Sequence, residues 1–212
     1  MERVLQFFHA GGFVMYPLAI LSLTAVFVIV ERLLAYRSLA HTAPGLLNKV
    51  ADAVRNNDFA GARKLCDGVP GPVAASLATA LDSRGANLHL AEGRVQETGE
   101  EFFVQMERFL PVLDTTTTIS PLLGLLGTIV GMIGTFQAVA NAKTAAATDA
   151  VLAGVGEALY ATATGLTIAV ICFVTYNYFA ARQKAAVGET EIAATKLINL
   201  MMSKGELVTH EV

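Results

Sequence analysis

Three long runs of apolar residues dominate the chain. They cover residues 10–30, 115–142 and 158–181, and none of them contains Asp, Glu, Lys or Arg. A helix needs about 20 apolar residues to cross a bilayer. The pattern therefore predicts an all-α membrane protein with three transmembrane helices, at 10–30, 115–142 and 150–181. The third helix begins either near residue 150 or at residue 158, and the two starts place Glu157 at different depths.

The polar stretch between the first two runs, residues 31–114, also has helical periodicity. Apolar residues recur at intervals of three and four in three segments, 46–54, 59–66 and 73–81. A further helix is expected from Leu88 towards the second span, with kinks at Pro111 and Pro121. We interpret the stretch as a helical extension of the membrane helices rather than as an independent domain.

Acidic residues are concentrated on the helix expected from Leu88. They are Glu92, Glu97, Glu100, Glu101 and Glu107. The simplest interpretation of such a run is a solvated face. The alternative is a surface that docks a partner.

Composition supports a membrane protein and argues against several other classes. Charged residues make up 16% of the chain, against about 25% in soluble domains. The net charge of −3 gives no overall positive charge of the kind that nucleic-acid-binding proteins use. Cys66 and Cys172 are interpreted as inert apolar residues, not as a disulfide framework. The four histidines lack metal-ligand spacing, and no phosphate-binding loop or serine-nucleophile motif is present. We therefore expect no metal, no cofactor and no enzymatic activity.

The distribution of Lys and Arg predicts an orientation in the membrane. Segments 1–9 and 143–149 contain only Arg3 and Lys143, whereas the other basic residues lie in 31–114 or in the tail 182–212. Because basic residues accumulate in cytoplasmic segments, the N-terminus and the short second loop are expected outside. The large loop and the tail are expected in the cytoplasm.

The second span carries a strip of glycines. Gly124, Gly127, Gly131 and Gly134 fall within about 80° of one another on a helix. Small residues allow membrane helices to approach closely, so these four are predicted to pack helices together. Thr128 lies beside the strip, and its hydroxyl either bonds to the backbone or lines a pore.

The third span begins near an acidic side chain that would be costly to bury in the bilayer. Glu157 is the only acidic residue between Asp149 and Glu189. A carboxylate inside the bilayer suggests an ion or proton pathway, whereas one at the boundary is a helix-start acid favoured by the helix dipole. Thr162 lies about 140° around the helix from Glu157. If both residues act, they face different neighbours, which suggests an oligomer.

Two motifs at their observed separation resemble the ExbB/TolQ/MotA proton-channel family. The second span, SPLLGLLGTIVGMIGTFQAV, resembles the family's second helix, and VGEALYATATGLTIAV followed by TYN resembles its third. The first span and its exit, GGFVMYPLAILS and IVERL, also resemble the family's first helix. The sequence Leu-Gly-Leu-Leu-Gly-Thr in the second span favours the ExbB branch over the TolQ branch.

The resemblance implies a function and partners. Such proteins form a ring, typically of five copies, around two single-span ExbD-like subunits in the bacterial inner membrane. The segments 1–9 and 143–149 would then be periplasmic. The complex couples the proton motive force to TonB-dependent transport across the outer membrane through a TonB-like protein. Glu157, Thr128 and Thr162 match the family's pathway positions, and the titrating aspartate is expected on the partner.

The chain departs from the family pattern at two positions. Ile171 stands where the family usually has proline, so a straighter helix is expected there, and Tyr160 replaces a residue that is usually smaller. A TolQ-like or gliding-type ring and a non-conducting membrane scaffold remain the alternative functions. H⁺ is preferred over Na⁺ because only one carboxylate and no evident cation cage are available.

Overall fold

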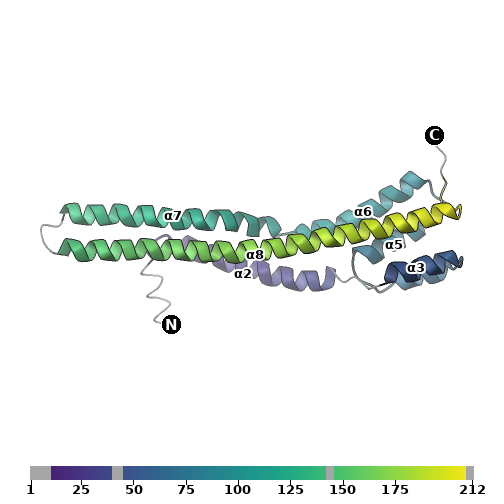
Figure 1. Ribbon diagram of the computed structural model, residues 1–212, viewed down its shortest axis with the longest axis horizontal. Helices are drawn as coiled ribbons and strands as arrows, with labels where there is room; N and C mark the ends of the chain where they lie inside the picture. Colours follow the sequence, from purple (N-terminus) through teal and green to yellow (C-terminus); the bar gives the residue numbers. More distant parts are fainter. Residues whose placement is uncertain (1–10, 40–44, 142–145, 209–212) are drawn as a thin grey trace. The chain divides into compact units, whose positions relative to one another are not determined.

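The computed structural model describes residues 11–39, 45–141 and 146–208, and every regular element in these ranges is an α-helix. The predicted all-α class is therefore confirmed for this part of the chain (Figure 1). The helices are α2 (Met15–Leu39), α3 (Leu46–Arg55), α4 (Phe59–Cys66), α5 (Pro72–Asp82), α6 (Leu88–Glu107), α7 (Leu110–Asn141) and α8 (Ala146–Ser203).

Three of the helical segments are long and apolar enough to cross a membrane, as predicted. Candidate spans lie within Met15–Arg37, Leu88–Ala140 and Val151–Ser203, with mean hydropathies of 2.2, 1.8 and 1.8. Large apolar side chains point away from the chain along α2, α7 and α8, for example Phe27, Leu122 and Val170. Exposed apolar surface of this extent suits a lipid environment or contacts with neighbouring proteins.

Several predicted features fall partly outside the described residues. The segment 1–9 and residues 143–145 of the expected loop 143–149 are among them, as are Arg3 and Lys143. The orientation that these two residues helped to define stays a prediction.

The chain divides into two compact units. The first comprises Met1–Val30 and Phe109–Tyr178, and the second comprises Glu31–Arg108 and Phe179–Val212. The second unit has its own hydrophobic core, with the fully buried residues Val50, Val54, Leu77, Leu197 and Met201 at its centre. The polar stretch after the first span and the C-terminal tail therefore build one core together, a pairing that the local pattern does not reveal.

The helix that was expected from Leu88 into the second span is broken just upstream of the kink expected at Pro111. Helix α6 ends at Glu107, and Phe109 adopts a left-handed backbone with φ of 68° before α7 begins. Pro111 occupies the first turn of α7, where its missing N–H removes no helical hydrogen bond. Pro121 lies inside α7, which continues through it.

The C-terminal end of α6 is capped by two buried side chains of α2. Arg32 donates from Nη1 to the carbonyl oxygens of Gln105 and Met106, at 2.8 and 3.4 Å. The Tyr36 hydroxyl donates to the oxygens of Met106 and Phe179, at 3.0 and 3.4 Å. The last carbonyls of a helix have no intrahelical donor, and a cation there also complements the helix dipole. These bonds hold α2, α6 and α8 together inside the second unit.

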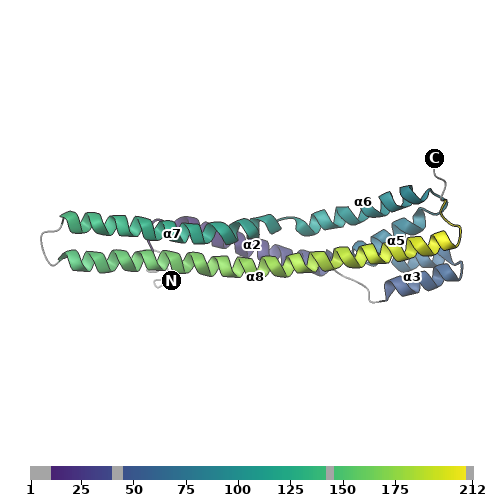
Figure 2. The same cartoon turned by 45° about the horizontal axis from the view of Figure 1, so that its top comes forward.

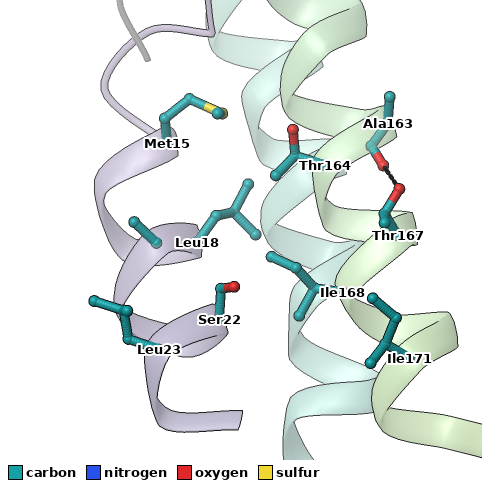
Figure 3. Close-up of a pocket in the computed structure, with 10 residues that line it drawn as sticks. Met15, Leu18, Ser22, Leu23, Ala163, Thr164, Thr167, Ile168 and Ile171 are labelled. Atoms are coloured by element: carbon teal, nitrogen blue, oxygen red, sulfur yellow. Dashed lines mark hydrogen bonds between the residues drawn. The ribbon is translucent and has the colours of Figure 1, made fainter. Parts of the chain in front are cut away.

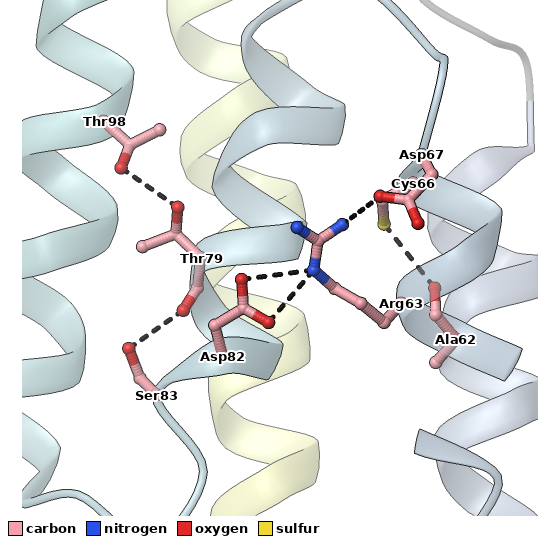
Figure 4. A network of polar contacts seen from close by, with 8 residues as sticks. All are labelled: Ala62, Arg63, Cys66, Asp67, Thr79, Asp82, Ser83 and Thr98. Atoms are coloured by element: carbon pink, nitrogen blue, oxygen red, sulfur yellow. Dashed lines mark hydrogen bonds and ion pairs between the residues drawn. The ribbon is translucent and has the colours of Figure 1, made fainter. Parts of the chain in front are cut away.

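Polar contacts join the shorter helices of the second unit (Figure 4). Arg63 of α4 donates from Nε to both carboxylate oxygens of Asp82 in α5, at 3.0 and 3.1 Å. The hydroxyls of Thr79 and Thr98 lie 3.0 Å apart and join α5 to α6. Cys66 is free and buried beside this network, and burial raises the pKa of its thiol. The expectation of inert cysteines agrees with this environment.

Replacing Tyr36 by Phe tests the cap. The change keeps the ring against Phe179, whose centroid is 4.9 Å away, but removes the hydroxyl donor. We expect the free energy of unfolding to fall by about 1 kcal/mol, measured by denaturant unfolding of the purified chain in mild detergent. Tyr16→Phe is the control, because Tyr16 is exposed. Equal stability of both variants would contradict the capping role.

The Cys66 thiol predicts a pH dependence of stability. Its pKa is raised in the folded chain, so its contribution is intact below the unfolded value of about 8.5 and is lost as pH rises through the folded value. We expect the midpoint of thermal unfolding to fall between about pH 7 and about pH 9.5, and to fall less in Cys66→Ala. Parallel pH profiles for the two proteins would contradict this assignment.

Candidate functional site

In the first unit, α7 and α8 approach so closely that backbone meets backbone. Both views show the two helices side by side over this region (Figures 1 and 2). A β-carbon placed on Gly124 would lie 3.0 Å from Cα of Thr162 and 3.2 Å from the oxygen of Ala161. A β-carbon on Gly165 would overlap the carbonyl oxygen of Ser120. Only glycine fits at this crossing.

The next two predicted glycines continue the contact along α7. A β-carbon on Gly127 would lie 2.5 Å from Cβ of Ala161, and one on Gly131 would lie 3.1 Å from Cβ of Ala158. Gly134 has nothing within 4 Å. Three of the four glycines thus face α8 of the same chain, and packing between neighbouring copies stays a prediction.

Sequence reasoning missed the matching small residues on α8. Gly154, Ala158, Ala161 and Gly165 recur at intervals of four, three and four, the spacing of one helix face. All four face α7. The same periodicity that identified the strip on the second span would have identified this complementary face.

The threonine hydroxyls are bonded to backbone carbonyls. Thr162 donates from Oγ1 across the helix pair to the oxygen of Gly124 at 3.0 Å. Thr128 donates within α7 to the oxygen of Leu125 at 2.7 Å, and Thr135 to that of Gly131 at 2.8 Å. Of the two alternatives for Thr128, the backbone bond is therefore present. Its half-buried oxygen still has capacity to accept a hydrogen bond.

Glu157 lies where α8 meets the start of α2. Its carboxylate is so close to Gly12 that a β-carbon there would overlap Oε1. Gly12 has a left-handed φ of 69°, and its carbonyl accepts from the N–H of Met15, the first residue of α2. The carboxylate is thus beside the residues that lead into α2. Gly12 was not predicted, because only the folded chain brings it to residue 157.

The three predicted pathway residues do not converge within one chain. Glu157 faces the start of α2, Thr162 faces α7, and Thr128 is bonded to its own helix. The expectation that Glu157 and Thr162 face different neighbours agrees with this arrangement, although both neighbours are helices of the same chain. Oligomerisation therefore stays a prediction.

A groove of about 490 Å³ separates α2 from α8 in the first unit (Figure 3). Met15 and Leu18 line one wall, while Thr164, Ile168 and Ile171 line the other. Helix α8 runs unbroken through Ile171, where the resemblance led us to expect a straighter helix. The groove is mostly apolar, and the polar side chains that line it are the hydroxyls of Ser22, Thr164 and Thr167.

Substitution of single glycines tests the helix crossing. Gly165→Ala would force a methyl group into the Ser120 carbonyl, and we expect a loss of about 1–3 kcal/mol in unfolding free energy. Gly134→Ala is the matched control, because the space beside it is open and alanine favours the helix. Denaturant unfolding followed by circular dichroism measures both. A stable Gly165→Ala variant would show that the helices can separate without cost.

Comparison with known proteins gives a consistent family assignment. A model of the MotA/TolQ/ExbB proton channel family matches residues 70–192. The chain is 33% identical over 171 residues to a putative biopolymer transport protein ExbB-like 3 of Synechocystis, covering 80% of this chain and 81% of the relative. It is also 33% identical over 180 residues to the biopolymer transport protein exbB1 of Vibrio cholerae, covering 80% and 76%.

A second branch of relatives matches a shorter part of the chain. The Tol-Pal system protein TolQ of Pseudomonas aeruginosa is 38% identical over 84 residues, which are 40% of this chain and 36% of that protein. The ExbB-like 3 and exbB1 relatives thus align over most of the chain, whereas this TolQ and the ExbB of Salmonella typhimurium align over less than half of it.

Proposed function

Because the chain belongs to the MotA/TolQ/ExbB proton channel family, we propose that it is the channel subunit of an ExbB-type motor. The motor couples the proton motive force to TonB-dependent transport across the outer membrane, and Glu157 lies on the proton pathway. The observation that carries the proposal is the Glu157 carboxylate held against Gly12, within a helix that is long and apolar enough to cross a membrane.

Glu157 has the chemistry that a proton pathway needs. A carboxyl group can exist with and without its proton. Placing a carboxylate among apolar membrane helices costs free energy, which suggests that the residue has a function there. Thr128 and Thr162 are proposed as further polar groups of the pathway, since their hydroxyls both donate and accept hydrogen bonds. One charge crossing 100 mV releases about 2.3 kcal/mol, so mechanical work requires several protons per cycle.

The proposed assembly is a ring of about five copies around two ExbD-like single-span subunits, acting on a TonB-like protein. It would lie in the bacterial inner membrane with the N-terminus in the periplasm and the C-terminus in the cytoplasm. The similarity to relatives named ExbB over most of the chain supports this choice. The copy number and partners rest on the family resemblance alone.

The match to TolQ supports a second candidate. In that case the same ring serves envelope maintenance, and deletion of the protein should damage envelope integrity while leaving energy-dependent uptake intact. A deletion strain assayed for both properties separates the two systems.

Replacing Glu157 by Gln tests the pathway in cells that depend on the complex. The amide has nearly the same shape but carries no titratable proton, so we expect energy-dependent uptake to fall at least about tenfold. Asp52→Asn is the control, because Asp52 is exposed on α3 and pairs with Arg55 of the same helix. Undiminished uptake by Glu157→Gln would contradict the role of Glu157.

The same variants also need an assembly measurement. Each tagged complex is purified from membranes in mild detergent, and its mass and composition are determined. About five copies with a small single-span subunit are expected for the parent and for Glu157→Gln. A monomer without a partner would contradict the ring, and a passive scaffold would assemble and function in spite of Glu157→Gln.

A further inference from the structure

A mixed polar and apolar groove runs between α6 and α8 in the second unit. Its volume is about 550 Å³, and its walls come from residues between Glu92 and Phe103 on α6 and between Val187 and Asn199 on α8. Both walls are three to four helical turns long, which is about 18 Å at 1.5 Å per residue. The groove takes no part in the proposed proton pathway.

The charge of the groove is of one sign. Three of its lining residues are the exposed glutamates Glu92, Glu100 and Glu191, and none is Lys or Arg. Glu97 and Glu101 extend the acidic surface along α6 in an adjoining hollow that Glu100 also lines. Like charges at this density repel one another, and a cationic partner relieves that repulsion.

A buried hydroxyl in the groove provides an independent sign of a ligand. Ser76 of α5 lines the groove, and its side chain is fully buried. Among the described residues its Oγ is one of two buried side-chain polar atoms without a hydrogen-bond partner. Leaving a buried hydroxyl unbonded is costly, and such groups in folded proteins need an explanation.

Gly99 keeps space open in front of this hydroxyl. It is buried on α6, and a β-carbon there would lie 3.7 Å from Ser76 Oγ. Alanine would fit, because the nearest atom, Cε2 of Phe103, would be 3.4 Å away. A glycine in the middle of a helix is unfavourable relative to alanine, so Gly99→Ala would favour the helix while placing a methyl group in contact with Ser76 Oγ.

We propose that this groove docks a basic amphipathic helix from another protein, with Lys or Arg side chains against the glutamates and small apolar residues against the floor. Grooves between two helices commonly receive a helix, which here would be about three turns long. Ser76 Oγ would donate to or accept from one polar group of that segment.

A second copy of this chain is a poorer occupant. Several of the unit's basic side chains are already bonded within their own chain. Arg55 pairs with Asp52, Arg63 with Asp82, and Arg84 with Glu206. These three arginines of a second copy are therefore committed, and we propose a separate protein as the occupant.

The test uses the full chain, purified in mild detergent, and a fluorescent helical peptide of about 14 residues. The peptide carries Lys on one face and Ala and Leu on the other, and a matched peptide has Glu in place of Lys. Fluorescence anisotropy measures binding at low and high salt. We expect the basic peptide to bind, the acidic peptide not to bind, and salt to weaken the complex.

Three variants locate the binding. Glu100→Gln with Glu191→Gln should weaken the Kd about tenfold, since two charge pairs are lost. Gly99→Ala and Ser76→Ala should each raise the Tm of the chain and yet weaken peptide binding about threefold. Asp52→Asn is the control, because it removes one exposed acid on α3, whose residues do not line the groove.

Three outcomes would overturn the proposal. The first is no binding of the basic peptide. The second is equal binding by the groove variants and Asp52→Asn, which would mean attraction to net charge alone. The third is a photo-crosslinker at Gln96, a lining residue, that joins two copies of this chain, because the groove would then be a contact between copies. Glu157→Gln should bind the peptide normally, so failure of the proton pathway is distinguishable from failure of this site.

Discussion

The direct backbone contact between α7 and α8 is the constraint on which the first unit depends. Lipid chains are as apolar as leucine, so membrane helices gain little from simple burial and associate through close packing and interhelical hydrogen bonds. Both are present here, because Gly124 and Gly165 lack side chains at the crossing and Thr162 donates to Gly124. The crossing also sets the register of α8. Glu157 lies about two turns from Gly165, and in this register its carboxylate lies beside Gly12.

The second unit is stabilised by a different balance of forces. Its core is built from fully buried aliphatic side chains such as Val50, Leu77 and Leu197, each worth about 1.5–3 kcal/mol on removal from water. Backbone carbonyls at helix ends receive hydrogen bonds from side chains, as those at the end of α6 do from Arg32 and Tyr36. The chain thus packs its helices through small residues in the unit proposed to lie in lipid, and through large aliphatic residues in the unit proposed to lie in water. Helix α8 shows both patterns along its length.

Local periodicity explains what could be predicted from the sequence. The apolar runs identified three helices of spanning length, and the glycine interval identified a packing face, because both signals repeat within one helix. Sequence reasoning missed Gly12, Ser76 and the Arg32 cap, because the role of each depends on contacts with residues far away in the sequence. The break between α6 and α7 was displaced for a related reason. Pro111 suits the first turn of a new helix, so the chain turns before it, at Phe109.

The position of Glu157 depends on a residue without a side chain. The carboxylate lies so close to Gly12 that a β-carbon there would overlap Oε1. Gly12 also has a left-handed φ of 69°, a backbone conformation that glycine adopts readily. Any side chain at residue 12 would therefore displace the carboxylate and strain the backbone just before α2. The place of the proposed pathway residue is thus set by a glycine far away in the sequence as much as by its own helix.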